Sequence, residues 1–316
     1  MPQRGSGPPQ TPAIPVRGDL AVIGPMARNA ADLALELSVA AGPDELNEGI
    51  GYKLALPPPR HDRLADFRVL VIDKHPLCPT AESITTALNG LVDRLAKLEV
   101  RVVRENPRLP DLAQTGRIYR ELLAAFFIAD LPLETLERAA TAVKDLPADD
   151  QSLAATQLRG LAISHADWIR KSRIRSGLRA RWLALFEDVD VVLCPPMPTV
   201  AFPHDHSPQF ARQLDIDGVK VPYNDQSVWA GIALLSGLAA TTMPVGRHRL
   251  IFEGPGGCPT APYDAILVVA PRSSEGLLTE PTAATQARWP EPVFMPQRRP
   301  LPGPRGFIGQ AGKAVI

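Results

Sequence analysis

The chain has 316 residues, of which 45% are hydrophobic, so it can bury the core of one large domain or of two ordinary ones. The formal net charge is zero and the isoelectric point lies near 7.0, which provides neither a basic surface for nucleic acid nor an acidic tail for a cationic partner. No apolar run reaches the roughly 18 residues of a membrane span, and the N-terminus lacks the apolar core of a signal peptide. We expect no nucleic acid and no membrane among the partners.

The three cysteines, Cys78, Cys194 and Cys258, are odd in number and lack the short paired spacings of zinc or redox motifs. This usage is typical of buried thiols in a reducing compartment rather than of a disulfide framework. We therefore expect a cytoplasmic protein.

Residues 1–18 are rich in proline, glycine and arginine without any periodicity, and they predict an extended loop. Asp19–Gly24 then predicts a short strand. Asn29 is a suitable N-cap for a helix over Ala30–Ala41, which a Gly-Pro pair would end.

Three elements predict a βαβ unit: a strand at Phe67–Asp73, an amphipathic helix at Thr80–Leu98 and a strand at Val100–Arg104. Such a unit requires a parallel pair of strands and a right-handed crossover. Asp73-Lys-His-Pro follows the first strand where a nucleotide-binding fold would have a glycine-rich loop, so we expect no dinucleotide or phosphate cradle.

From Asp111 to Glu187 the hydrophobic spacing predicts helices, which are interrupted at Pro132 and near Pro147. The last of them, His165–Phe186, interleaves arginines with apolar and aromatic residues. An arginine-rich helix can indicate RNA or a membrane surface, but the chain is neutral overall and acidic residues follow directly. We interpret this segment as solvated arginines on a helix that packs on the core.

Val189–Cys194 is an apolar, β-branched run stopped by two prolines, and it predicts a buried strand. Asp217 and Gly218 stand between apolar residues and predict a hairpin with a type I′ turn. Asp225 or Ser227 can cap the next helix, whose apolar residues recur at helical spacing at Val228, Trp229, Ile232, Leu235 and Leu238.

Ala239–Val245 predicts a second buried strand. After His248 the composition shifts to proline, glycine and arginine, with one strand-like run at Ala265–Ala270. A reading-frame shift near His248 is one hypothesis for this change.

Several motifs, in this order, resemble the amidase-signature family, which contains bacterial amidases and the A subunit of the glutamyl-tRNA amidotransferase. They are Gly24-Pro-Met-Ala-Arg, the strand ending in Cys-Pro-Pro, a Pro-His-Asp loop, the Asp-Gly hairpin, Pro222–Gly231 (PYNDQSVWAG) and Gly237–Gly246 (GLAATTMPVG). The resemblance implies an α/β fold with a mixed sheet flanked by helices. It predicts an incomplete amidase domain over residues 1–248 and an irregular, divergent tail over residues 249–316.

Members of this family resemble one another in a serine, cis-serine and lysine arrangement that hydrolyses carboxamide C–N bonds without metal or organic cofactor. The nucleophile lies in a Gly-Gly-Ser-Ser-Gly-Gly type loop upstream of the motifs matched here. Neither Ser6 nor Ser273-Ser274 stands in such a context, and no lysine of the chain fits the base. We therefore assign no catalytic residue and expect a truncated, inactive fragment. The alternatives are the C-terminal half of a split amidase, complemented by an N-terminal fragment, and a non-catalytic α/β binding module.

The resemblance further implies that four residues line the pocket for a small amide substrate: Tyr223, Asp225, Gln226 and Trp229. In the amidotransferase branch the aspartate at the Asp225 position is expected to bind the polar head of the substrate. Each assignment has an alternative, since an acid at a helix start also acts as a cap and a tryptophan is often a core residue.

His204-Asp-His206 offers two imidazoles at short range, but the sequence indicates no third metal ligand. We interpret this segment as a hydrogen-bonded loop and expect neither metal nor cofactor.

Overall fold

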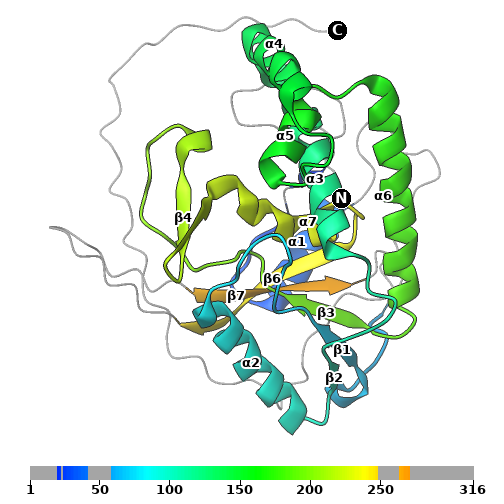
Figure 1. The fold of residues 1–316 in the computed structure, drawn as a ribbon. Helices are drawn as coiled ribbons and strands as arrows, with labels where there is room; N and C mark the ends of the chain where they lie inside the picture. Colours follow the sequence, from blue (N-terminus) through cyan, green and yellow to red (C-terminus); the bar gives the residue numbers. More distant parts are fainter. Residues whose placement is uncertain (1–19, 23, 42–57, 248–262, 271–316) are drawn as a thin grey trace, which may run out of the picture. The chain divides into compact units, whose positions relative to one another are not determined.

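The computed structural model describes residues 20–22, 24–41, 58–247 and 263–270 (Figure 1). Its main element is a five-stranded mixed sheet with the strand order β2-β1-β3-β7-β6. Strand β1 pairs in parallel with β2 and β3, whereas β7 is antiparallel to both β3 and β6. The strands are β1 (Arg68–Val71), β2 (Arg101–Val103), β3 (Val191–Cys194), β6 (Ala239–Arg247) and β7 (Tyr263–Ala270).

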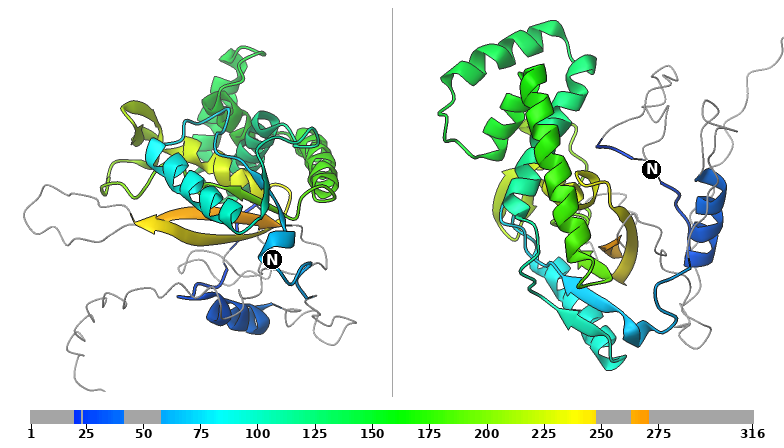
Figure 2. Two further views of the ribbon diagram at one scale, coloured as in Figure 1. Left: turned by 90° about the horizontal axis from the view of Figure 1, so that it is seen from below. Right: turned by 90° about the vertical axis from the view of Figure 1, so that its right-hand side faces the viewer.

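Helices flank this sheet, as predicted. They are α1 (Ala30–Ala40), α2 (Glu82–Lys97), α3 (Leu112–Phe126), α4 (Leu133–Ala142), α5 (Leu153–Leu161), α6 (His165–Leu185) and α7 (Ser227–Leu234), with short 3-10 turns at Leu64–Asp66, Phe127–Asp130, Val143–Asp145, Gln209–Ala211 and Tyr223–Gln226 (η5). In Figure 1, α2 lies below strands β3 and β7, whereas α4 and α5 lie above them; Figure 2 gives two further views of the same elements. No helix in the described ranges is long and apolar enough to cross a bilayer.

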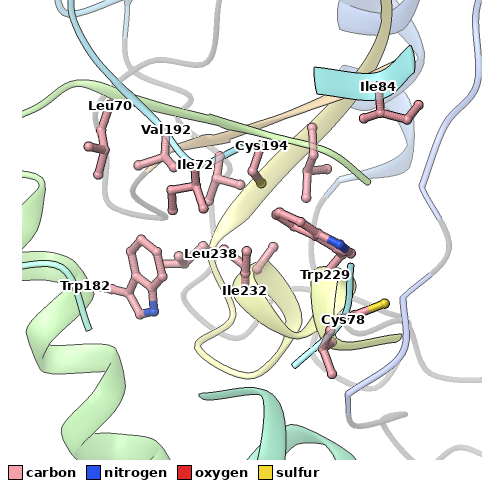
Figure 3. Packing of buried hydrophobic residues seen from close by; sticks show 14 of the residues in the cluster. Leu70, Ile72, Cys78, Ile84, Trp182, Val192, Cys194, Trp229, Ile232 and Leu238 are labelled. Carbon is pink, nitrogen blue, oxygen red and sulfur yellow. The ribbon is translucent and has the colours of Figure 1, made fainter. Parts of the chain in front are cut away.

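Alternate residues of the strands feed two separate cores, because successive strand side chains point to opposite faces. Val69 and Val71 of β1 pack with Leu88 of α2 on one face. On the other face, Leu70 and Val192 pack with helical residues that include two fully buried tryptophans, Trp182 of α6 and Trp229 of α7 (Figure 3).

Local signals set most element starts. Asn29 caps α1 by accepting a hydrogen bond from the Asp32 N–H, as predicted. The hairpin of β4 (Gln213–Ile216) and β5 (Val219–Pro222) turns at Asp217 and Gly218, which have φ values of 50° and 84°, as a type I′ turn requires. The Asp217 carboxylate then accepts a 2.7 Å hydrogen bond from the N–H of Glu82, the first residue of α2.

Two predicted strands differ from the structure. Leu20–Ala21–Val22 form no strand, because Leu20 has a φ of 60° and directs a buried side chain against Ile118 and Leu122 of α3. Strand β6 does form at Ala239–Arg247, but its side chains from Ala239 to Val245 are partly or fully exposed rather than buried. It is an edge strand paired only with β7 among the described residues, which explains its exposure.

The run at Ala265–Ala270 belongs to a central strand. As part of β7 it lies between β3 and β6, so the sheet continues beyond residue 248. The predicted boundary at that residue stays a prediction, and the predicted tail beyond Ala270 lies outside the described residues.

Asp190 fixes the register of the parallel strands β1 and β3 at the point where both begin. Its carboxylate accepts hydrogen bonds from the backbone N–H and from Nη2 of Arg68, both at 2.8 Å, and from Nη1 of Arg60 at 2.6 Å. Its own N–H donates to the carbonyl oxygen of Arg68 at 2.8 Å. Burial alone would raise the pKa of this carboxyl, but the hydrogen bonds from Arg68 and Arg60 outweigh it and hold the pKa well below its usual range.

We expect Asp190→Asn to lower the free energy of unfolding by about 3 kcal/mol at pH 7, because it leaves two guanidinium groups without their buried counter-charge. Since the folded-state pKa is depressed, this stabilisation is present above the unfolded pKa of about 4 and is lost as the pH falls below it. Urea unfolding at pH 7 measures the effect. Asp188→Asn, two residues away and more exposed, is the control and is expected to cost less than about 1 kcal/mol; equal losses would contradict the assignment.

Two helical glycines have opposite surroundings. A Cβ on Gly160 of α5 would collide with the carbonyl oxygen of Glu121 and lie 2.8 Å from Cβ of Ala124, so this glycine lets α5 approach α3. A Cβ on Gly177 of α6 would meet nothing within 4 Å.

We expect Gly160→Ala to destabilise the protein by more than about 2 kcal/mol and Gly177→Ala to stabilise it by up to about 1 kcal/mol, since alanine favours a helix when space allows. Thermal and urea denaturation of the two variants check this. A Gly160→Ala variant as stable as the parent would mean that α3 and α5 are not in close contact.

Candidate functional site

The site is built at the carboxyl edge of the parallel strands. Strands β1 and β3 run in the same direction, so the loops that follow them, residues 72–80 and 195–200, leave the sheet at the same edge. The Ala81 N–H donates a 2.8 Å hydrogen bond to the Pro198 carbonyl oxygen and so connects the two loops. This edge is the usual ligand-binding position of open α/β sheets.

The turn η5 and helix α7 carry the four residues predicted to line a substrate pocket. The close packing of α7 on α3 positions these four residues. It is possible because residue 231 is a glycine: a Cβ at this position would lie only 2.8 Å from the ring of Tyr119 on α3. Gly116 of α3 in turn faces His75 and Val228, at 3.2 and 3.3 Å from an added Cβ. These glycines bring α3, α7 and the loop after β1 into contact.

Neither Asp225 nor Ser227 caps α7, contrary to the prediction. The 3-10 turn runs directly into the helix, so the N-cap position falls on Gln226, which makes no side-chain capping bond. The Ser227 hydroxyl accepts a hydrogen bond from Arg120 instead. The Asp225 carboxylate makes no hydrogen bond or ion pair within the described part of the chain.

Arg120 is the site residue that the sequence did not identify. Its Nη1 donates to the Asn224 carbonyl oxygen at 2.9 Å and to Ser227 Oγ at 3.1 Å, while Nη2 donates to Oε1 of Gln157 on α5. The side chain is 6% exposed, and burial lowers its pKa while the negative charge of Asp225 opposes that shift. Arg120 therefore bonds to a residue on each side of Asp225, the Asn224 carbonyl oxygen and the Ser227 hydroxyl, without forming an ion pair with Asp225.

The half-buried Asp225 carboxyl has a raised pKa. Burial is the cause, and the nearby charge of Arg120 partly offsets it. A carboxylate that is partly desolvated, fixed in position and unbonded is available to accept hydrogen bonds from a ligand.

The other three predicted pocket residues differ in accessibility. Tyr223 is partly exposed, with its ring edge-on to Phe202 at 5.9 Å and 5.8 Å below the guanidinium of Arg212. Gln226 is buried, and its Oε1 has no hydrogen-bond partner. Trp229 is fully buried in the core, and its Nε1 is also without a partner. The four residues thus share one turn and the start of one helix but have different surroundings, and their assignment to a substrate pocket stays a prediction.

His75 also lies at this edge, four residues after the end of β1. Its ring packs edge-on against Trp229 with 5.3 Å between centroids. Burial lowers its pKa to about 4, so the imidazole is neutral at pH 7. In the sequence, His75 is a single histidine in the loop that follows a predicted buried strand. Nothing in its neighbouring residues distinguishes it from an exposed histidine, so the sequence alone does not identify it as a site residue.

Other reactive groups give no sign of a nucleophile or metal centre in the described ranges. Burial, with Asp225 adding to it, raises the pKa of Cys78 to about 12, which keeps the thiol protonated. His204 and His206 lie 6.1 Å apart between ring centroids, and Asp205 accepts from the Ser207 N–H within the same loop. No group of three metal-ligating side chains occurs among the described residues.

Comparison with known proteins agrees with this geometry. The family model for Amidase matches residues 2–265. The chain belongs to the amidase family. It is 29% identical over 251 residues to the A subunit of the glutamyl-tRNA(Gln) amidotransferase of Thermus thermophilus, covering 73% of this chain and 49% of the relative. It is 29% identical over 242 residues to the 2-amino-5-chloromuconic acid deaminase of Comamonas testosteroni, covering 74% of this chain and 46% of the relative.

The amidase fold also matches solved structures. The A subunit of the glutamyl-tRNA(Gln) amidotransferase of Thermotoga maritima aligns with a TM-score of 0.53 at 16% identity, over 79% of this chain and 48% of the other. A fatty acid amide hydrolase aligns with a TM-score of 0.53 at 14% identity, over 79% and 45%. The chain spans about half the length of the curated relatives that it matches.

The neutral His75 of this chain predicts a loss of stability in mild acid. Its folded pKa of about 4 lies below the unfolded value of about 6.5, so its contribution is fully present above pH 6.5 and is lost as the pH falls towards 4. The full difference is on the order of 3 kcal/mol. We expect His75→Gln to flatten the pH dependence of unfolding in this window, while His165→Gln on the exposed start of α6 leaves it unchanged. Identical profiles for the parent and His75→Gln would contradict the burial of a neutral imidazole.

Proposed function

We propose that this chain forms the part of a carboxamide-hydrolysing amidase that binds the substrate, with Asp225 as the residue that binds its polar group. The observation that carries the proposal is the Asp225 carboxylate: it is half-buried, held from both sides by Arg120, and free of hydrogen bonds within the described residues. Tyr223, Gln226 and Trp229 lie on the same turn and helix, and we keep them as proposed pocket residues. No cofactor or metal is part of the proposal.

We further propose that this polypeptide does not hydrolyse amides alone. The family mechanism needs a serine, a cis-serine and a lysine in a defined context, and none of the serines and lysines of the chain has that context. If the amidase is split between two polypeptides, a complementing N-terminal fragment supplies the serine, cis-serine and lysine. Strand β6 supports the idea, because its outer backbone edge has no partner among the described strands and is available to a further strand.

We further propose that this protein is cytoplasmic, and its buried free thiols support this location. Cys78 and Cys194 are both free and buried, which fits a reducing compartment.

The test combines binding and turnover. We expect titration of the full chain with benzamide or propionamide, followed by amide NMR shifts, to give saturable binding that Asp225→Asn weakens about 10-fold, through the loss of a charge-assisted hydrogen bond. Asp215→Asn in the exposed hairpin is the control and is expected to bind like the parent. Binding that survives Asp225→Asn unchanged would remove Asp225 from the site.

The same preparation is assayed for ammonia release, alone and with added N-terminal halves of related amidases. We expect no release by the chain alone and release only from the mixture. Hydrolysis by the purified chain alone, abolished by heat denaturation, would overturn the proposal of an inactive polypeptide.

A further inference from the structure

Helix α6 buries only one of its faces. Leu178, Trp182 and Leu185, spaced by four and three residues, pack into the core. Ile169 and Leu183 lie on the opposite side of the helix, where both are exposed. In all, α6 carries four large apolar side chains that are more than a third exposed, namely Trp168, Ile169, Ile174 and Leu183. Such a concentration on one surface helix indicates a surface that another element covers.

The same helix is basic. It contains six basic residues and a single acidic residue. Arg170 and Lys171 are each paired with an acidic side chain. Arg173, Arg179 and Arg181 are exposed and form no ion pair within the described residues. The exposed part of α6, from Trp168 to Leu183, therefore combines uncompensated positive charge with apolar surface, and we call it the basic face.

The corner between α3 and α4 has the opposite charge. From Leu133 to Asp150 the chain has five acidic residues and two basic ones. Glu134 and Glu137 are both exposed on α4. Three large apolar side chains are exposed at the same corner: Phe126, Phe127 and Leu133. The first two pack edge-on, with 5.2 Å between ring centroids. We call this corner, from Phe126 to Glu137, the acidic face.

The two faces do not neutralise each other within one chain. No ion pair in the described part of the chain joins α4 to α6, and in Figure 1 α4 lies at the top of the view whereas α6 lies at its right. Contact between the basic faces of two copies would set arginines against arginines, which is unfavourable. Contact between a basic face and the acidic face of another copy sets arginines against glutamates and apolar side chains against apolar side chains.

We propose that two copies of this chain associate through these faces, with α6 of each copy packed against the α3–α4 corner of the other. A two-fold axis relates the two contacts, so both basic and both acidic faces are used and the assembly closes at a dimer. With 21 residues, α6 is about 30 Å long and offers an extended contact. The apolar side chains supply the buried surface, and the ion pairs fix the orientation. This inference goes beyond the proposed function and does not depend on it.

The first experiment measures the oligomeric state of the full chain by sedimentation equilibrium at pH 7. We expect a reversible dimer with a dissociation constant on the order of 10 μM at low salt. Raising the salt concentration to about 1 M weakens it at least about 10-fold, because the ion pairs are screened. A chain that remains monomeric far above this concentration would overturn the proposal.

Charge reversal tests each face separately. Arg173→Glu combined with Arg179→Glu makes the basic face acidic, and Glu134→Arg combined with Glu137→Arg makes the acidic face basic. We expect each double variant to dimerise at least about 100-fold more weakly than the parent, because like charges then meet in both contacts. Either variant dimerising as tightly as the parent would contradict the assigned faces.

The matched control reverses two charges elsewhere. Lys97 at the end of α2 and Arg101 at the start of β2 are exposed and belong to neither face. We expect the combined variant Lys97→Glu and Arg101→Glu to dimerise like the parent. A loss as large as that of the other two variants would mean that net charge alone controls association, and would overturn the proposal.

Mixing the two charge-reversed chains distinguishes a lost contact from a damaged fold. In their heterodimer, each contact again joins one acidic and one basic face. We therefore expect the equimolar mixture to form a one-to-one heterodimer with an affinity within about 10-fold of the parent. A mixture that stays monomeric, although circular dichroism shows both variants folded, would overturn the proposal.

A different occupant of α6 would give a different result. The parent chain is also tested for binding to anionic lipid vesicles and to RNA. A monomeric parent that binds either one, and loses this binding in the Arg173→Glu and Arg179→Glu variant, would assign the basic face to that partner and overturn the dimer.

Discussion

The arrangement of the site depends on how Asp190 holds the parallel strands at their start. The carboxylate bonds the first residue of β1 through its backbone and its guanidinium, and the Asp190 N–H returns a bond to the same residue. With Val69 opposite Val191 and Val71 opposite Leu193, the two strands end within one residue of each other. The loops that follow then leave the sheet side by side. One of them contains His75, and the other is bonded to the start of α2.

At this edge, the close packing of α3 against α7 and the loop after β1 positions the polar groups of the site. Gly116 and Gly231 remove the side chains that would separate α3 from its neighbours, and the backbones approach as a result. The short distance lets Arg120 reach across to the Asn224 carbonyl and the Ser227 hydroxyl. Burying a guanidinium costs free energy, which hydrogen bonds to three different segments offset. These hydrogen bonds of Arg120 fix the position of Asp225, while the Asp225 carboxylate oxygens accept no hydrogen bond from the described residues.

The sequence predicted the features that depend on local chemistry. The Asn29 cap, the Asp217-Gly218 turn and the buried strand of β3 each follow from a few adjacent residues, and each is present. The strand predicted at Asp19–Gly24 and the burial of β6 were wrong, because the tertiary neighbours decide them: Leu20 packs into α3, and β6 lies at an edge. The site itself was predictable only in part, for the same reason. Resemblance to a family located η5 and α7, but Arg120 lies about 100 residues earlier on a helix whose apolar face gives no hint of a buried charge. Long-range contacts of this kind, set by glycine spacing and helix approach, leave no local pattern in a single sequence.

Burial at this edge keeps the described reactive side chains in their uncharged forms. Nucleophilic attack needs a group that is deprotonated or has a base beside it. Here burial keeps the Cys78 thiol protonated and the His75 ring neutral, the latter with its only lone pair already bonded to Leu77. Neither group is therefore an activated nucleophile at this edge of the sheet.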